Sequence, residues 1–153
     1  MANYVRRTCF VLLTMLFTLA APLMALAEDI IILHTNDIHC GVLDNVGFPR
    51  LAQYKKDLKK AGHKVLLVDA GDCVQGAPIG KLSQGESVVR IMNAVKYDFL
   101  IPGNHEFDYG MDQFFKLAKM QKSKYHSCNF IDLRTNTLPL FPSKIIKIGG
   151  KTL

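Results

Sequence analysis

Three short strand-like runs in this chain each end in a cluster of polar residues, and this repeated order constrains the fold more than any other feature. The runs fall in 29–35, 64–70 and 98–101, and the first two are continuous stretches of Ile, Leu and Val. Such stretches are typical of buried strands. Amphipathic segments with helical spacing lie between the runs. The alternation predicts an α/β fold with a mostly parallel sheet and flanking helices.

Three helices are expected to cover this sheet. Apolar residues recur at helical spacing over 48–61 and again over 110–121. A further helix is expected to begin at Ser83, because Glu86 follows three positions later and completes a capping box. The first helix also carries four lysines that we expect on its solvated face: Lys55, Lys56, Lys59 and Lys60.

The rest of the chain predicts loops and short strands. Gly and Pro residues predict a loop over 71–81. Strands are expected over 125–128 and over 143–148. Gly149 and Gly150 then predict a hairpin turn, with a returning strand that has only begun when the sequence stops. We therefore expect the chain to stop in the middle of an element.

Composition excludes several classes of protein. The chain has 153 residues, of which 49% are hydrophobic and 21% charged, so it fits one globular domain rather than a disordered chain or a polytopic membrane protein. Its 19 basic and 13 acidic side chains give a formal net charge of +6. This excess is small and scattered, so no nucleic-acid partner is expected.

The first 27 residues are interpreted as a secretory signal peptide. Arg6 and Arg7 precede a nearly apolar stretch over 9–24, and the small residues of 25–27 form a cleavage site. An uncleaved membrane anchor is the alternative, but the apolar run is short of the roughly 20 residues that a spanning helix needs. We expect an exported mature chain of residues 28–153 with no stable membrane span after cleavage.

Three cysteines remain in that mature chain: Cys40, Cys73 and Cys128. An odd number in an exported protein leaves at least one thiol unpaired. No two cysteines have the CxxC spacing of a zinc site or a redox motif. We therefore expect all three to be small buried apolar side chains.

The polar clusters after the three runs combine residue types that suit a divalent cation. The carboxyl ends of parallel strands meet at one edge of a sheet, where ligands bind. That edge would gather five side chains in one crevice, and their oxygen and nitrogen atoms suit Zn²⁺ or Mn²⁺. They are Asp37, His39, Asp72, Asn104 and His105. Each cluster alone is commonly a turn, but their order at three successive strand ends predicts a site.

Local arguments assign roles to some of these residues and their neighbours. Asp37 and His39 are two residues apart, so on an extended backbone both side chains can point the same way. Asp72 could bridge two metals about 4 Å apart. Asn36 is expected to orient a ligand, and Asp69 to bond loop amides. His34, His63 and His126 are expected to be structural or solvated.

The three clusters also carry a resemblance to a known family. The segments LHTNDIHCG, LLVDAGDCVQGAP and IPGNHEFDYG resemble the calcineurin-like metallophosphoesterases, and within them the family of 5′-nucleotidases and 2′,3′-cyclic-nucleotide phosphodiesterases. The resemblance implies the N-terminal part of a metallophosphoesterase α/β sandwich. The resemblance spans nearly all of residues 28–153. The second half of that domain and the family's C-terminal nucleotide-binding domain have no counterpart in this sequence.

The resemblance implies a role for each matching residue. Asp37 and His39 would bind the first of two divalent metals, Asp72 would bridge both, and Asn104 would bind the second and contact the substrate. His105 would not be a ligand but would face the substrate phosphate and stabilise the transition state. Asp108 would orient His105. Glu106 also belongs to the family's motif, and we expect it to be a structural brace of the loop.

The implied activity is metal-dependent hydrolysis of nucleotide phosphate esters, as in nucleotide breakdown by a 5′-nucleotidase. Different specificities within the family stay open, including 2′,3′-cyclic phosphodiesterase with 3′-nucleotidase activity and UDP-sugar hydrolase. The second metal would have only Asp72 and Asn104 as ligands, so this chain alone is expected to be inactive or weakly active. Two further interpretations stay open, namely an inactive exported metal-binding module and a fragment of a longer gene product.

Overall fold

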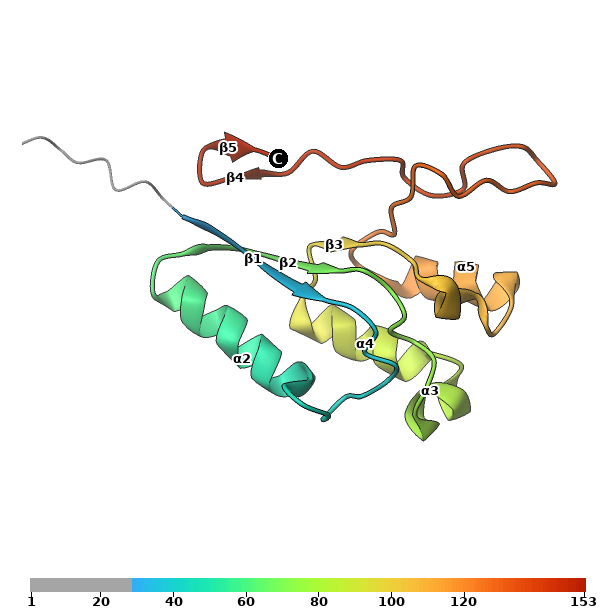
Figure 1. The fold of residues 1–153 in the computed structure, drawn as a ribbon, viewed down its shortest axis with the longest axis horizontal. Coiled ribbons are helices and arrows are strands. Elements are labelled where there is room, and N and C mark those ends of the chain that lie inside the picture. The colour runs from blue at the N-terminus through green and yellow to red at the C-terminus, as the bar shows by residue number, and fades with distance from the viewer. Residues whose placement is uncertain (1–28) are drawn as a thin grey trace, which may run out of the picture.

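A three-stranded parallel sheet forms the centre of the fold. The structure is a computed structural model that describes residues 29–153, so the expected signal peptide lies outside the described residues. The strands are β1 (Ile30–Thr35), β2 (Lys64–Asp69) and β3 (Phe99–Leu100), in the order β1-β2-β3 (Figure 1). Both pairings are parallel. The predicted α/β fold with a parallel sheet is therefore confirmed.

The register of this sheet aligns the carboxyl ends of the three strands with one another. Thr35 pairs with Asp69, and Asp69 in turn pairs with Leu100. These three residues are the last of their strands. Because all three strands run the same way, the loops that follow them leave the sheet at one edge.

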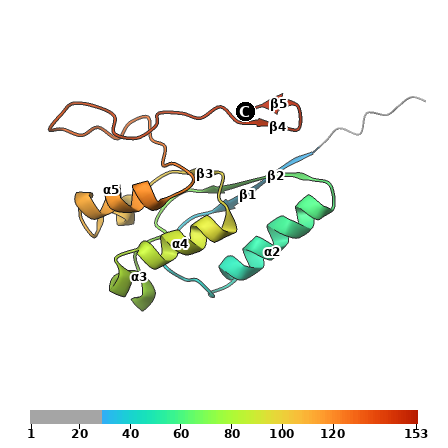
Figure 2. The same ribbon diagram turned by 180° about the vertical axis from the view of Figure 1, so that it is seen from behind.

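Helices cover one face of the sheet. They are α2 (Gly47–Lys60), α3 (Pro78–Ser83), α4 (Glu86–Val95) and α5 (Met111–Met120), and all lie on the same side of the strands (Figure 2). Their apolar residues pack against β2 and β3 in a core whose most buried members are Leu67, Cys73, Val74, Val88, Val89, Met92, Leu100, Phe114 and Leu117. Among residues 29–153, none of the helices has the length and apolar character needed to cross a membrane.

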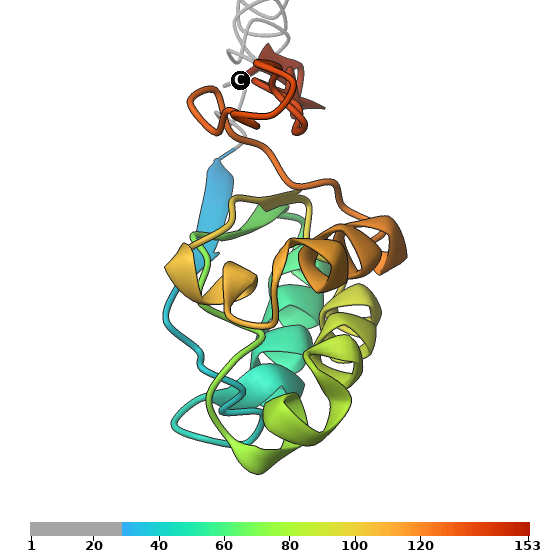
Figure 3. The ribbon, with the colours of Figure 1, turned by 90° about the vertical axis from the view of Figure 1, so that its right-hand side faces the viewer.

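A hairpin on the opposite side is set apart from the helices (Figure 3). It consists of β4 (Lys147–Ile148) and β5 (Lys151–Thr152), which pair antiparallel. The turn between them has positive φ at Gly149 and Gly150, so the predicted hairpin turn is confirmed.

The remaining two expected strands are shorter than predicted. The strand expected over 143–148 is reduced to β4, with one further pair of backbone hydrogen bonds between Ile146 and Leu153. In the segment 125–128, Tyr125 makes an isolated bridge to Leu100, and His126 makes one to Phe141. These single bridges continue the sheet beyond β3 without building a regular fourth strand.

The helix expected to begin at Ser83 begins at Glu86 instead. Ser83 ends α3, a helix that occupies part of the loop expected over 71–81 and begins at Pro78. Gly85 separates the two helices with a φ of 86°, a conformation that favours glycine. The Ser83 hydroxyl accepts a hydrogen bond from the Ser87 N–H at 3.2 Å, so Ser83 joins α3 to α4 rather than capping a single helix.

Two expectations about burial were wrong because of the position of β1 and α2. Ile32 is 57% exposed, since β1 is an edge strand and the helices cover only one face of the sheet. Lys55 of α2 is buried rather than solvated. Its ammonium group donates hydrogen bonds to the Asp98 carboxylate, at 3.0 Å, and to the Lys96 carbonyl. Burial lowers the pKa of Lys55, and the hydrogen bond to Asp98 opposes that shift.

The burial of the three cysteines agrees with the sequence expectation in part, and that of His126 agrees fully. Cys40 and Cys73 are buried in the core as predicted, whereas Cys128 is exposed. His126 is buried and stacks on Phe99, with ring centroids 4.4 Å apart. Its expected structural role is therefore confirmed.

Replacing Gly71 with Ala is expected to destabilise the protein more than replacing Gly62 with Ala. Both glycines have positive φ, 100° and 96°, so both substitutions incur backbone strain of about 1 kcal/mol or more. A Cβ at Gly71 would also clash with the backbone of Gly103, whereas a Cβ at Gly62 would meet open space. Urea unfolding of the two variants measures the difference, and equal losses would contradict the close approach of the two loops.

Candidate metal centre

The loop after β1 stays paired to the loop after β2 beyond the end of both strands. The N–H of Asp37 donates to the carbonyl of Gly71 at 3.0 Å, and the N–H of His39 donates to the carbonyl of Asp72 at 2.9 Å. These bonds place the side chains of both loops at the same edge of the sheet. The loop residues are therefore positioned by backbone pairing as well as by the strands that carry them.

The backbone of these residues is not extended, which corrects the sequence argument about their spacing. Asp37, His39 and Asp72 have φ values of 52°, 47° and 58°. Such left-handed conformations are uncommon for residues other than glycine and are enriched at functional sites. The side chains of Asp37 and His39 approach each other because of a turn after β1, not because they alternate along a strand.

The loop after β2 and the loop after β3 touch directly. An added Cβ at Gly71 would clash with the backbone of Gly103, and one at Gly103 would clash with the Asp72 carboxylate. The Oδ1 atom of Asp72 accepts a hydrogen bond from the His105 N–H at 2.8 Å. Both glycines are thus required for the contact that places Asp72 beside His105.

These contacts bring one ligand atom each of His39, Asp72 and His105 within 4.8 Å of one another. The rings of His39 and His105 meet edge to face, with centroids 4.9 Å apart. The Nδ1 atom of His39 lies 3.2 Å from the carbonyl oxygen of Gln75. Since a carbonyl only accepts, Nδ1 carries the proton in this bond and Nε2 is left as a ligand atom. Two imidazoles and a carboxylate suit Zn²⁺ or a similar divalent ion.

The remaining predicted metal ligands lie beside this group. The Asp37 carboxylate is 3.7 Å from His39 Nε2 and is mostly exposed, so it lies next to the three-residue group but outside it. The amide of Asn36 donates a hydrogen bond to Asp37, as expected of a residue that orients a ligand. Asn104 is the first residue of the short helix η1 (Asn104–Phe107), and it is exposed directly before His105.

The structure places Asp108 against His105. The Nδ1 atom of His105 and the Oδ2 atom of Asp108 are 2.7 Å apart. This hydrogen bond is the largest cause that raises the pKa of His105, because a carboxylate stabilises the imidazolium form. The pair can therefore hold a positive charge at the edge of the metal centre.

Two buried carboxylates support the loops from behind. Asp69 accepts hydrogen bonds from the Gly71 N–H at 3.0 Å and from the Thr35 hydroxyl at 2.6 Å, so the expected bonding of loop amides is confirmed. Glu106 is 1% exposed and accepts three backbone N–H groups, as expected of a loop brace. The Gln75 carbonyl, which orients His39, could not be predicted from the sequence, because no side-chain pattern marks a backbone acceptor.

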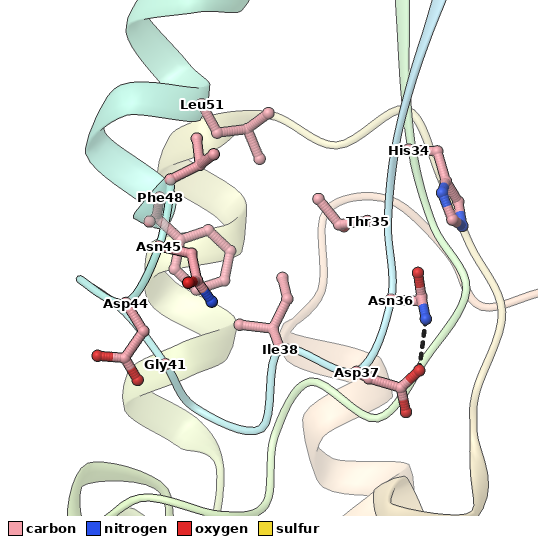
Figure 4. A pocket seen from close by; sticks show the side chains of 12 residues that line it. His34, Thr35, Asn36, Asp37, Ile38, Gly41, Asp44, Asn45, Phe48 and Leu51 are labelled. Atoms are coloured by element: carbon pink, nitrogen blue, oxygen red, sulfur yellow. Dashed lines mark hydrogen bonds between the residues drawn. The ribbon is translucent and has the colours of Figure 1, made fainter.

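A cavity of about 350 Å³ lies beside the metal centre, between the loop after β1 and the start of α2. Ile38, Phe48 and Leu51 lie on one side of the β1 backbone, and Asn36 and Asp37 lie on the other (Figure 4). The cavity shares Asp37 with the predicted site but does not include the group of His39, Asp72 and His105.

The fold is that of a known class of enzymes. Residues 30–151 match the family of calcineurin-like phosphoesterases, and the chain belongs to this family. It is 31% identical over 159 residues to the snake venom 5′-nucleotidase of Crotalus adamanteus, covering 88% of this chain and 26% of that protein. It is 32% identical over 153 residues to the 2′,3′-cyclic-nucleotide 2′-phosphodiesterase/3′-nucleotidase of Salmonella typhimurium, covering 88% of this chain and 24% of that protein.

A solved structure shows the same fold. The NAD nucleotidase of Haemophilus influenzae superposes with a TM-score of 0.70 at 27% identity, covering 79% of this chain and 24% of that one. The chain thus spans about a quarter of the length of each of these three relatives. The family relationship and the α/β fold are established by these matches.

The buried Asp69 predicts a pH dependence of stability. Burial is the largest cause that raises the pKa of Asp69, from 3.8 to about 7. A raised pKa means that folding favours the protonated acid, so this contribution to stability is complete below pH 3.8 and is lost as the pH rises through about 7. Relative to Asp69→Asn, the wild type should lose on the order of 3 kcal/mol of unfolding free energy between pH 4 and pH 8.

The measurement is denaturant unfolding of both proteins across this pH range, with a metal chelator present throughout. The variant keeps a side-chain oxygen that can accept from the Gly71 N–H, so the comparison isolates the ionisation. Parallel pH profiles of the two proteins would show that Asp69 does not titrate in this way.

Proposed function

We propose that this chain carries the front part of a nucleotide phosphohydrolase of the 5′-nucleotidase type, which uses divalent metals. The observation that carries the proposal is the convergence of His39, Asp72 and His105, with Asp108 bonded to His105. Membership of the phosphoesterase family and the names of the relatives support hydrolysis of nucleotide phosphate esters. The proposed substrate is accordingly a nucleotide.

The chain's own residues provide ligands for the metals. We propose that Asp37, His39 and Asp72 hold the first ion, and that Asp72 and Asn104 hold a second. One oxygen of Asp72 accepts the His105 N–H, which orients the carboxylate and leaves its second oxygen for a cation. When bound, divalent ions would activate water and polarise a phosphate oxygen. With only two proposed ligands for the second ion, these 153 residues alone are expected to be inactive or weakly active.

His105 is proposed as a stabiliser of charge on the reacting phosphate rather than as a metal ligand. Asp108 holds the proton at Nδ1 of His105, so the Nε2–H of the imidazolium is free to donate to a phosphate oxygen. Negative charge grows on these oxygens in the transition state, and a positioned donor stabilises it. His105 is also close enough to His39 and Asp72 to be a metal ligand itself. Replacing His105 distinguishes a metal ligand from a stabiliser of the phosphate charge.

A second candidate activity is hydrolysis of 2′,3′-cyclic nucleotides together with 3′-nucleotides. The relative with that name is 32% identical, against 31% for the venom 5′-nucleotidase. The residues proposed above would act on the metals and the phosphate, and no residue is proposed here for the base or the sugar. A panel of AMP, 3′-AMP and 2′,3′-cyclic AMP distinguishes the two activities.

The His105→Gln variant tests the catalytic role. Removing one positioned donor lowers kcat by roughly 10²- to 10³-fold, while Zn²⁺ binding should be unchanged if His105 is not a ligand. Asp72→Asn should lose both hydrolysis and metal binding. The readouts are hydrolysis of a sensitive phosphate ester and Zn²⁺ affinity by competition with a chromophoric chelator.

His63→Gln is the matched control, because His63 is exposed after α2 and outside the metal centre. It should retain both the activity and the affinity of the wild type. Loss of Zn²⁺ binding in His105→Gln would assign His105 as a ligand instead. Unchanged hydrolysis in that variant would overturn the proposed catalytic role.

We further propose that residues 1–27 are removed on export and that residues 28–153 form the metallophosphoesterase part. The support is the sequence pattern of the first 27 residues and the relative found in a venom. N-terminal sequencing of the product released by the source cells should begin at Glu28. A product that keeps Met1 would contradict this processing.

A further inference from the structure

Glu106 connects the two loops that carry Asp72 and His105. Its Oε2 atom accepts hydrogen bonds from the Asp72 N–H at 2.7 Å and from the Gly103 N–H at 2.6 Å. Its Oε1 atom accepts a third bond from the Cys73 N–H at 2.8 Å. Two donors belong to the loop after β2 and one to the loop after β3, so a single side chain bonds both loops.

A carboxylate is suited to this position for a physical reason. An ionised carboxylate only accepts hydrogen bonds, and the three partners of its two oxygens are all N–H donors. Bonds from N–H groups to a charged acceptor are stronger than those between neutral groups. These bonds also compensate the burial of the carboxylate, since Glu106 is only 1% exposed.

The contact reaches the metal centre through the backbone of Asp72. Glu106 holds the Asp72 N–H, and the His105 N–H holds the Asp72 carboxylate. Both bonds cross between the same two loops, and neither loop has room to shift towards its neighbour at Gly71 or Gly103. Loss of a Glu106 bond is therefore expected to displace the Asp72 carboxylate relative to His39 and His105.

We propose that Glu106 is a positioning residue that sets the ligand geometry of the metal centre, acting through the backbone amides of Asp72, Cys73 and Gly103. This inference rests on the proposed function, because it requires that Asp72 binds a metal. It differs from a purely stabilising role, in which loss of Glu106 would weaken the fold and leave the metal affinity of the folded protein unchanged.

Glu106→Gln tests this role with little change in size. The amide oxygen can still accept the Asp72 and Gly103 N–H groups, but the amide nitrogen cannot accept from Cys73. Removing such a supporting partner is expected to weaken Zn²⁺ binding by about 10- to 100-fold. Affinity is measured on the full chain by competition with a chromophoric chelator, well below the unfolding temperature of each protein.

Lys55→Met is the matched control. It removes a buried charged side chain from α2 that bonds Asp98 and the Lys96 carbonyl, away from the loops of the metal centre. It should lower the unfolding temperature without changing Zn²⁺ affinity, whereas Glu106→Gln should lose affinity while folded. This result would support a positioning role.

Two results would overturn the inference while leaving the proposed function intact. Glu106→Gln could bind Zn²⁺ as tightly as the wild type, or Lys55→Met could lose as much affinity as Glu106→Gln, which would show that affinity follows stability. A wild-type chain that binds no Zn²⁺ would overturn the proposed metal centre and this inference together.

Discussion

The contact between the loop after β2 and the loop after β3 is the constraint on which the rest of the site depends. Glycine at both 71 and 103 lets the backbones meet, and the buried carboxylate of Glu106 bonds amides from both sides. Asp72 and His105 then face each other across the junction. The parallel register of the sheet brings the loops to the same edge. The contact between the loops after β2 and β3 then places the Asp72 carboxylate beside His105.

The sequence predicted the parts of the structure that follow from local patterns. Apolar runs located β1 and β2, and helical spacing located α2 and α5, within a few residues of their bounds. The location of the candidate site could also be predicted, because parallel strands place the loops that follow them at one edge of the sheet. Asp72, His39 and His105 converge there, and Asp108 lies against His105. The roles assigned to these residues, and to Asp37 and Asn104, stay predictions.

The expectations that failed depend on partners distant in the sequence. Lys55 looks like one of four solvated lysines until Asp98, which is 43 positions away, provides a buried partner. Ile32 looks buried until the sheet order shows that β1 is an edge. Ser83 has the pattern of a helix start, but Gly85 moves that start and Ser83 instead joins two helices. Local periodicity does not contain this information.

Anomalous diffraction at the zinc edge, from crystals of the full chain grown with Zn²⁺, would show whether the three loops bind a metal ion. We predict an anomalous peak at a Zn²⁺ ion that His39 and Asp72 bind, with the His105 ring bonded to Asp108 and directed towards the space beside the ion. An ion held elsewhere on the chain, or no ordered ion near Asp72, would contradict the proposal that these three loops form a metal centre.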